Sequence, residues 1–598
     1  MEEIDLVVIG AGVSGLAVAK TFYQLNPDSS LLILEAASTL GGTWAKERLY
    51  PGLKSNNMLG TYEYPDFPMD PNTFGVKPGE HIPGAVLHDY ATAYAEKFGI
   101  LQKIKYGHKV LIAEHLEVPE GGWVLTAQEP SGSKRTFAAK KLVVATGLTS
   151  QPFMPDFNGQ ESFEAPLFHN KDFLKHAGTI KTAKSVTVFG GTKSAWDAVY
   201  EYATNGVHVD WVIRASGHGP CWMAPPYVTP LKKWLEKLVH TRLLTWFSPC
   251  VWGSADGYPG VRNFLHGTVI GRFIVNTFWG ILGNDVITLN KYDSHPEMQK
   301  LKPWSQAMFV GAGLSILNYS TDFFDLVRDG AVSVHIADID RLSSHTVHLS
   351  NGKSFGTDAF MSTTGWKHVP PMQFLPAGIE KELGIPSPTP ENDDDATQVW
   401  NHDAAEGPAG PEQNLHPLAD APGISTSDPA AAPSSSTPVT PYHLYRFMVP
   451  ASDRLLRSRD IAFVGMTTNI TFAPIAHLQS LWIYAYFQDK LTPQVLPPLN
   501  SSLESQKQQD AWTNKKMESV QYETVLHSRF GKWRYPAGHG AQFPDFVFDA
   551  VPYLDLLLGD LGVRYHRKSG WLAEITEPYG PQDYRDVVGE WAKMNDNS

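Results

Sequence analysis

Two glycine-rich turns have the spacing that lets a protein backbone hold the pyrophosphate of a dinucleotide. The first turn, residues 10–15, reads GAGVSG and follows the apolar run 6–9. In such a turn one glycine permits the bend, a second admits the phosphates and a third allows close helix–strand packing. A carboxylate stands 25 residues beyond the first glycine, where it can bind a ribose diol and repel a 2′-phosphate. These features predict binding of FAD or NAD by Gly10, Gly12, Ser14, Gly15 and Glu35.

The second turn, residues 190–195, reads GGTKSA and departs from the pattern. Thr192 stands where the glycine that faces the pyrophosphate is expected, and it adds a side chain at the tightest point. Arg214 follows 24 residues after Gly190, and a guanidinium at that position suits a 2′-phosphate, with Ser216 near enough to assist. We predict an NADPH site here, and a degenerate structural turn with a solvated arginine is the alternative. The residues assigned to it are Gly190, Thr192, Lys193, Ser194 and Arg214.

Composition narrows the chemistry that fits these turns. The 598 residues are 42% hydrophobic and 19% charged, which is typical of a soluble globular protein with two or three domains. The net charge of −13 argues against a nucleic-acid partner, which needs clustered Lys and Arg. Cys221 and Cys250 form no C-x-x-C, so we expect no disulfide framework, no redox-active cysteine pair and no metal.

The elements that must position the turns follow an alternation of strand and helix patterns. The apolar runs 6–9 and 31–34, with a helical pattern between them, form one β–α–β unit, and the buried run 141–147 closes the same sheet. A second β–α–β unit begins at Ser185, and its second strand is the run 209–213. We therefore predict an α/β fold with two doubly wound, Rossmann-like dinucleotide-binding domains.

Three further segments carry a specific resemblance: 41–44 (GGTW), 50–56 (YPGLKSN) and 163–173 (FEAPLFHNKDF). They resemble the flavin-containing monooxygenases and their relatives, the type I Baeyer–Villiger monooxygenases, although Ala165 replaces a glycine of the last motif. The resemblance implies that the GGTW segment lies along FAD and that Asn56 lies beside the reactive flavin edge and the nicotinamide. The site residues that it adds are Gly42, Thr43, Trp44, Asn56 and Gln479.

The same resemblance implies that the NADP domain is inserted into the FAD domain. We expect the first part of the FAD domain at 1–160, and the NADPH-binding domain at 161–355 with an aromatic-rich insertion at 219–306. We expect a return to the FAD domain at 356–385, and its last part with a helical C-terminal region at 442–598. The low-complexity stretch 386–441 is rich in Pro, Ser, Ala and Asp, and we predict a disordered linker there.

The function that the resemblance implies is that of an NADPH- and FAD-dependent monooxygenase. Such an enzyme forms a C4a-(hydro)peroxyflavin and inserts one oxygen atom of O₂ into a small-molecule substrate. Here we expect a bulky apolar substrate, because the insertion is rich in aromatic residues. Asn56 is our candidate for the catalytic hydrogen bond. Similarity of the C-terminal stretches to fungal members implies a secondary-metabolite pathway.

Two alternatives stay open. Asn56, Phe173 and one extra residue before the YPG segment favour oxygenation at nitrogen or sulfur, whereas a Baeyer–Villiger monooxygenase would convert a ketone to an ester or lactone. A non-catalytic dinucleotide-binding redox sensor is a second alternative, supported by Thr192 and Ala165.

No signal or transit peptide is recognisable before the first strand, so we expect a cytoplasmic protein. The stretch 267–282 is the most apolar, but it contains Arg272 and Asn276 and is shorter than a membrane span. We interpret it as a buried or surface-lying helix, which leaves peripheral membrane contact open. The sequence indicates no oligomeric state.

Overall fold

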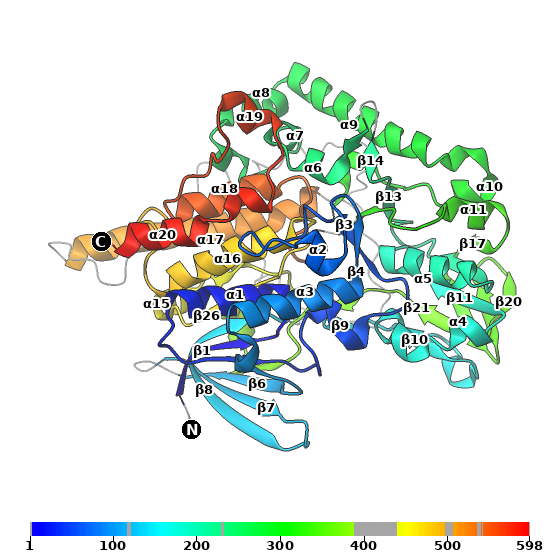
Figure 1. Ribbon diagram of the computed structural model, residues 1–598, viewed down its shortest axis with the longest axis horizontal. Coiled ribbons are helices and arrows are strands. Elements are labelled where there is room, and N and C mark those ends of the chain that lie inside the picture. Colours follow the sequence, from blue (N-terminus) through cyan, green and yellow to red (C-terminus); the bar gives the residue numbers. More distant parts are fainter. Residues whose placement is uncertain are drawn as a thin grey trace.

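The computed structural model describes residues 3–116, 121–228, 232–311, 313–387, 439–496, 506–534, 540 and 542–596. It contains two large sheets with helices packed on their faces and a separate helical layer (Figure 1). The parallel pairs in both sheets confirm the predicted α/β class. The expected linker at 386–441 lies almost wholly at 388–438, outside the described residues.

The first sheet has eight strands in the order β23-β6-β7-β8-β1-β2-β5, with β26 beside β8. Its parallel half places β1 next to β2 and β8, with Leu6 opposite Leu31. Its other half is an antiparallel meander of β6, β7 and β8, which the expected parallel arrangement did not include. The strands are β1 (Glu3–Ile9), β2 (Leu31–Leu34), β5 (Ile104–Lys105), β6 (Lys109–His115), β7 (Trp123–Gln128), β8 (Lys134–Val144), β23 (Gln373–Leu375) and β26 (Ile461–Phe463).

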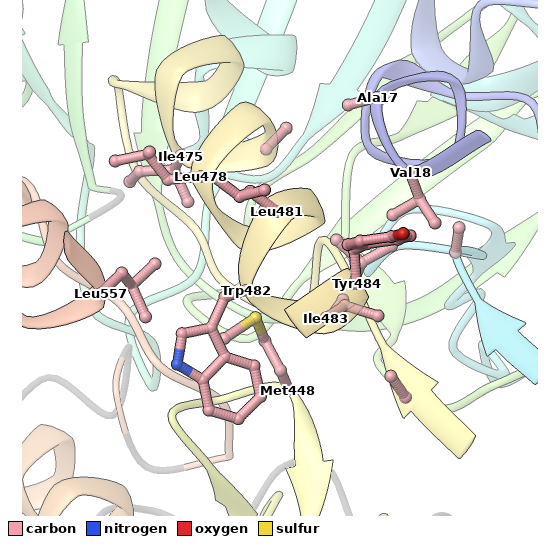
Figure 2. Packing of buried hydrophobic residues seen from close by; sticks show 14 of the residues in the cluster. Ala17, Val18, Met448, Ile475, Leu478, Leu481, Trp482, Ile483, Tyr484 and Leu557 are labelled. Carbon is pink, nitrogen blue, oxygen red and sulfur yellow. The ribbon is translucent and has the colours of Figure 1, made fainter. Parts of the chain in front are cut away.

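Helices α1 (Val13–Leu25), α3 (Gly84–Lys97) and α16 (Phe472–Phe487) cover this sheet (Figure 1). Ala17 and Val18 of α1 lie near the side chains of α16, and Trp482 lies near Met448 (Figure 2). Nearly every residue of α16 is buried, which is the pattern of a helix at the centre of a large core. The last part of the chain therefore belongs to the same core as the first glycine turn.

The second sheet has five parallel strands in the order β10-β21-β11-β12-β17. These are β10 (Leu167–His169), β21 (Phe360–Ser362), β11 (Ser185–Phe189), β12 (His208–Ile213) and β17 (Val332–Ile336). Helix α5 (Lys193–Thr204) follows β11, and a three-stranded antiparallel sheet follows β17: β18 (Ile339–Ser343), β19 (Thr346–Leu349) and β20 (Ser354–Gly356).

The return to the first sheet begins later than the expected residue 356. Strand β21 pairs with β10 and β11 of the second sheet, and the chain rejoins the first sheet only at β23. The apolar strand and small-residue end of this segment would suit either sheet, so the sequence pattern alone does not separate them. The two crossovers meet as an antiparallel pair, β9 (Gln151–Pro152) with β22 (Trp366–Lys367).

The predicted insertion is mainly a helical layer. Strands β13 (Trp222–Ala224) and β16 (Leu314–Ile316) pair at its base. Its helices are α6 (Leu235–Val239), α7 (Arg242–Thr245), α8 (Pro259–Gly267), α9 (Val269–Leu289) and α10 (Pro296–Gln299). The C-terminal helices are α17 (Gln506–Arg534), α18 (Ala550–Asp560), α19 (Trp571–Thr576) and α20 (Val587–Asp596). Among the described residues, no helix is long and apolar enough to span a bilayer.

Candidate functional site

The first glycine turn joins β1 to α1 with no room for side chains on the strand side. Gly10 has φ +108°, and a Cβ there would lie 2.6 Å from the carbonyl oxygen of Ala145. A Cβ on Gly15 would overlap the carbonyl oxygen of Gly10. Gly12 is the N-cap of α1, and a Cβ on it would meet only Gly42, at 3.7 Å. The outer side of this turn is therefore bare backbone, as an approaching pyrophosphate requires.

The GGTW segment lies beside that turn. The amide of Gly41 donates to the carbonyl oxygen of Ala11 at 2.9 Å. Gly42, Thr43 and Trp44 form one turn of 3₁₀ helix, in which Trp44 Nε1 donates to Tyr62 Oη at 2.8 Å. Thr43 Oγ1 lies 3.4 Å from Thr149 Oγ1. The residues that the resemblance assigned to the length of FAD are thus assembled next to the pyrophosphate turn.

Glu35 ends β2 and is almost buried, at 9% exposed. Its carboxylate accepts hydrogen bonds from the backbone amides of Ala11, at 2.7 Å, and Ala37, at 2.8 Å. Burial raises the pKa of Glu35, while these two backbone bonds act to lower it. The carboxylate therefore braces the turn, and its contact with a ribose stays a prediction. Ser14 is buried. It lies beside the residues that follow β26, as a Cβ built on Gly465 would be 2.7 Å from Ser14 Oγ.

Asn56 lies on β3 (Lys54–Met58), which pairs with β4 (His81–Pro83). Its neighbours Ser55 and Asn57 are buried, whereas Asn56 itself is half-buried. This alternation is expected of a strand, where successive side chains point to opposite sides. Asn57 Nδ2 donates to Glu236 Oε1 at 2.5 Å and to the carbonyl oxygen of Ile470 at 2.8 Å. The strand is thus fixed on the side opposite to Asn56.

Glu236 is a buried acidic residue beside the candidate site that the sequence does not reveal. Its side chain is fully buried in the insertion and accepts three more hydrogen bonds, from Met58 N at 2.9 Å, Thr61 Oγ1 at 2.8 Å and Trp234 Nε1 at 2.9 Å. Burial raises its pKa, and these bonds lower it. A residue 179 positions from Asn57 gives no local signal of such contact.

The second glycine turn has the same backbone shape as the first. Thr192 is the N-cap of α5 with φ −81° and ψ 171°, close to the φ −78° and ψ −179° of Gly12. This conformation is open to any residue. The Thr192 side chain is exposed and makes no cap bond, so the substitution does not distort the turn. Gly190 has φ +128°, and a Cβ on it would overlap Thr363.

Lys193 is engaged by neighbouring side chains of the protein. Its Nζ pairs with Asp197 one turn along α5 and contacts Asn318 Oδ1 at 3.0 Å and Tyr319 Oη at 3.3 Å. The Asn318 amide in turn donates to the carbonyl oxygen of Ser55 at 3.1 Å. The acidic residue at i+4 attracts the ammonium, and a contact of Lys193 with the cofactor stays a prediction. Through Asn318, Lys193 links α5 to the strand of Asn56.

Arg214 follows β12 and is half-buried. Within the part of the chain that the structure describes, its guanidinium has no ion-pair partner, which leaves it available to an anion. Ser216 Oγ donates to Asp338 Oδ1 at 2.5 Å, so this hydroxyl is already engaged. Ser194 is half-buried in the first turn of α5. The nicotinamide assignment of this turn therefore rests mainly on Arg214.

Two further residues are fixed in the interior. Gln479 is 1% exposed, and its Nε2 donates to Tyr553 Oη at 2.9 Å, while its role as a flavin contact stays a prediction. His169 accepts a bond from Lys171 N at Nδ1 and lies 2.9 Å from the Gly365 carbonyl through Nε2. Burial lowers the pKa of His169 to about 4, so the ring is neutral. It ties β10 to the returning crossover.

Comparison with known proteins gives concordant results. The profile of the pyridine nucleotide-disulphide oxidoreductase family matches residues 7–243. The chain is 32% identical to FAD-dependent monooxygenase rstn6 of Aspergillus nomiae, over 98% of each chain. It is equally similar to FAD-dependent monooxygenase resA of Aspergillus sclerotiorum, at 32% over 98% of each. An open crystal structure of cyclohexanone monooxygenase shares the fold with a TM-score of 0.56 and 16% identity, over all of this chain and 98% of that one.

Proposed function

The chain belongs to the FAD-dependent monooxygenases, and from this membership we propose that it is an NADPH-dependent member that oxygenates a bulky apolar substrate at nitrogen or sulfur. The observation that carries the proposal is the connection between the second turn and β3. Lys193 of α5 contacts Asn318, and Asn318 bonds to the backbone of Ser55, next to Asn56. A nicotinamide held at the second turn would thus lie on an element anchored to the strand of the candidate catalytic residue. We propose a secondary-metabolite pathway as the setting.

Each residue has a defined task in this proposal. The chemistry that bound FAD would supply is hydride acceptance from a nicotinamide and electron transfer to O₂. Gly12 and Gly42 leave room for the FAD pyrophosphate, and Arg214 offers a fixed positive charge to the 2′-phosphate of NADPH. Asn56 offers an amide that can donate or accept a hydrogen bond at the flavin edge. Glu236 and Asn318 hold the strand of Asn56 from two sides, so this amide is preorganised.

The first prediction concerns the nicotinamide. Under anaerobic conditions NADPH should bleach the flavin absorbance much faster than NADH at equal concentration. The Arg214→Ala variant should bind NADPH roughly ten- to a hundredfold more weakly, because a hydrogen bond to a charged group contributes about 1.5–3 kcal/mol. Its affinity for NADH should not change. The matched control is Arg341→Ala, which removes an exposed arginine from β18 of the neighbouring sheet.

Equal use of NADH and NADPH by the parent enzyme would contradict the proposal, as would an Arg214→Ala variant with unchanged NADPH affinity. The oxygenation step is tested by product analysis. Sulfides and tertiary amines should yield oxides, whereas ester or lactone formation from ketones would assign the enzyme to Baeyer–Villiger chemistry instead. Failure to reconstitute the protein with FAD would contradict the oxygenase proposal and favour the alternative of a non-catalytic dinucleotide-binding redox sensor.

A further inference from the structure

Large apolar side chains are concentrated on one exposed face of the insertion. Of the 16 large hydrophobic residues that are exposed in the described part of the chain, ten lie within 243–289 or at 571–572. This concentration is too uneven for scattered surface residues, which need no explanation. We define the apolar face as Phe264, Val269, Ile270, Phe273, Ile274 and Ile281, all on α8 and α9.

Helix α9 is apolar on both sides. One stripe, formed by Val275, Trp279 and Val286 with two glycines, is buried against the protein. On the opposite side Val269 is 76% exposed, Phe273 71% and Ile281 68%. A helix that is hydrophobic all round is normally covered on all sides, by protein or by lipid. The structure covers only the inner stripe.

Two of the polar side chains on the outer side of α9 form hydrogen bonds within the helix, whereas Asn276 and Asn284 are exposed amides. Arg272 is the single charged residue among the exposed positions of the helix. The hydroxyls of Thr277 and Thr288 donate to the carbonyl oxygens of Phe273 and Asn284 on the same helix, each at 2.8 Å. These hydroxyls therefore need no hydrogen-bond acceptor from the surroundings, as a lipid-facing helix requires.

The charge distribution points the same way. The chain has a net charge of −13, yet residues 257–284 contain neither Asp nor Glu, and of their two arginines Arg262 is buried and paired with Asp256, so that Arg272 is the exposed one. A segment free of acidic residues avoids repulsion from anionic headgroups, which the rest of such a chain would experience. Helix α19 lies beside the insertion helices along the same edge of the molecule (Figure 1), where Trp571 is 75% exposed. A tryptophan at the edge of an apolar face suits the headgroup region of a bilayer.

We propose that the apolar face of α8 and α9 docks on the surface of a lipid bilayer, with α9 lying in the plane of the interface. The helix would enter the headgroup and upper acyl region by its outer side, while Val275 and Trp279 stay packed on the protein. Apolar contact drives the association, so neutral lipid is sufficient. The proposal does not depend on the oxygenation chemistry.

Vesicle flotation tests this docking. The FAD-loaded enzyme should float with phosphatidylcholine vesicles in the absence of substrate and NADPH, and 0.5 M NaCl should change the bound fraction little, since screening acts on charges. The double variant Ile270→Asn/Phe273→Asn should bind at least tenfold more weakly. The matched control Leu116→Asn/Leu174→Asn changes two exposed apolar residues elsewhere and should bind as the parent does.

Two outcomes would overturn the docking. The first is parent enzyme that stays with the soluble fraction, or that binds no better than the double variant. The second is a parent dimer in sedimentation velocity that the double variant converts to monomers, because the face would then be a contact between two copies. Lipids brominated near the headgroup should also quench part of the tryptophan fluorescence, and Trp571→Phe should abolish that part. Flavin bleaching by NADPH should stay unchanged in the double variant, so failure here and failure of the oxygenase proposal are separable.

Discussion

Asn56 is positioned through its neighbours rather than through bonds of its own side chain. Asn57 and Met58 bind Glu236, and the Ser55 carbonyl accepts a bond from Asn318. Both partners come from segments more than 170 residues away along the chain. The geometry of Asn56 therefore depends on the insertion and on the second sheet being in place together.

The Asn56→Ala variant should keep consuming NADPH while it loses product formation. Because the amide would no longer hold the reacting oxygen, most of the consumed NADPH should appear as hydrogen peroxide. The measurement is the ratio of peroxide and product to NADPH consumed under air. Asn72→Ala, at an exposed position of α2 (Pro71–Phe74), is the control and should stay coupled. Unchanged coupling in Asn56→Ala would remove Asn56 from the reaction.

Residue types and spacing were sufficient to predict both glycine turns, because the strand, turn and helix of each lie within 30 consecutive residues. They did not reveal the residues that Lys193 contacts within the protein. These residues, Asp197 and Asn318, differ in kind: one lies a turn away on α5, and the other is 125 residues distant. Tertiary packing determines which residues form a polar pair that is distant along the chain, such as Lys193 and Asn318.

At the scale of elements, the joint between β1 and α1 separates two uses of glycine. Gly15 is needed for packing, because a side chain there would overlap the carbonyl of Gly10. Gly12 has room for a Cβ and an ordinary backbone conformation, so the fold itself does not require glycine at that position. We attribute the glycine at this position to the approach of the cofactor.

This difference gives a matched pair of variants. Gly15→Ala should destabilise the apoprotein by roughly 1–3 kcal/mol, the usual cost of overpacking a core, and lower its melting temperature. Gly12→Ala should melt like the parent as apoprotein yet retain little FAD after gel filtration, because its methyl group lies where the pyrophosphate must approach. A Gly12→Ala protein that holds FAD with native affinity would show that the pyrophosphate binds elsewhere.

Element boundaries were predictable where a pattern was local and failed where two sheets could accept the same strand. Strand β21 illustrates this, since its apolar residues and small-residue end fit either sheet. Only its pairing with β10 and β11 decides the matter. The helical character of the insertion was equally open, because aromatic richness indicates burial without indicating the element that is buried.

Across the whole molecule, buried histidines link stability to pH. Burial lowers the pKa of His240, His266 and His477 to about 4 each, from an ordinary value of 6.5. They are neutral in the folded protein at pH 5, whereas the unfolded chain binds a proton at each. The free energy of unfolding is therefore highest above pH 6.5. It decreases as the pH falls toward 4, by up to about 1.4 kcal/mol per pH unit for each histidine, because the unfolded chain binds the proton that the folded protein does not.

Urea denaturation at pH 7 and pH 5 checks this expectation. The urea concentration at the midpoint should fall markedly at pH 5. The fall should be smaller in His477→Gln, because this variant lacks one of the histidines that are protonated on unfolding. Asn72→Ala, which replaces an exposed side chain that carries no titratable group, should leave the pH dependence as it is in the parent. A His477→Gln protein with the parental pH dependence would mean that this ring is not kept neutral by burial.

The paired crossovers β9 and β22 have the position expected of a hinge between the two sheets. The amide of Phe153 donates to the Gly365 carbonyl at 3.0 Å, and His169 binds the same carbonyl, so the two passages between the sheets form one ribbon. We expect any rotation of the second sheet against the first to twist this ribbon. Such a motion would change the distance between the two glycine turns and leave the strand registers of both sheets intact. That freedom is what a coenzyme that arrives, reacts and departs requires of its half of the enzyme.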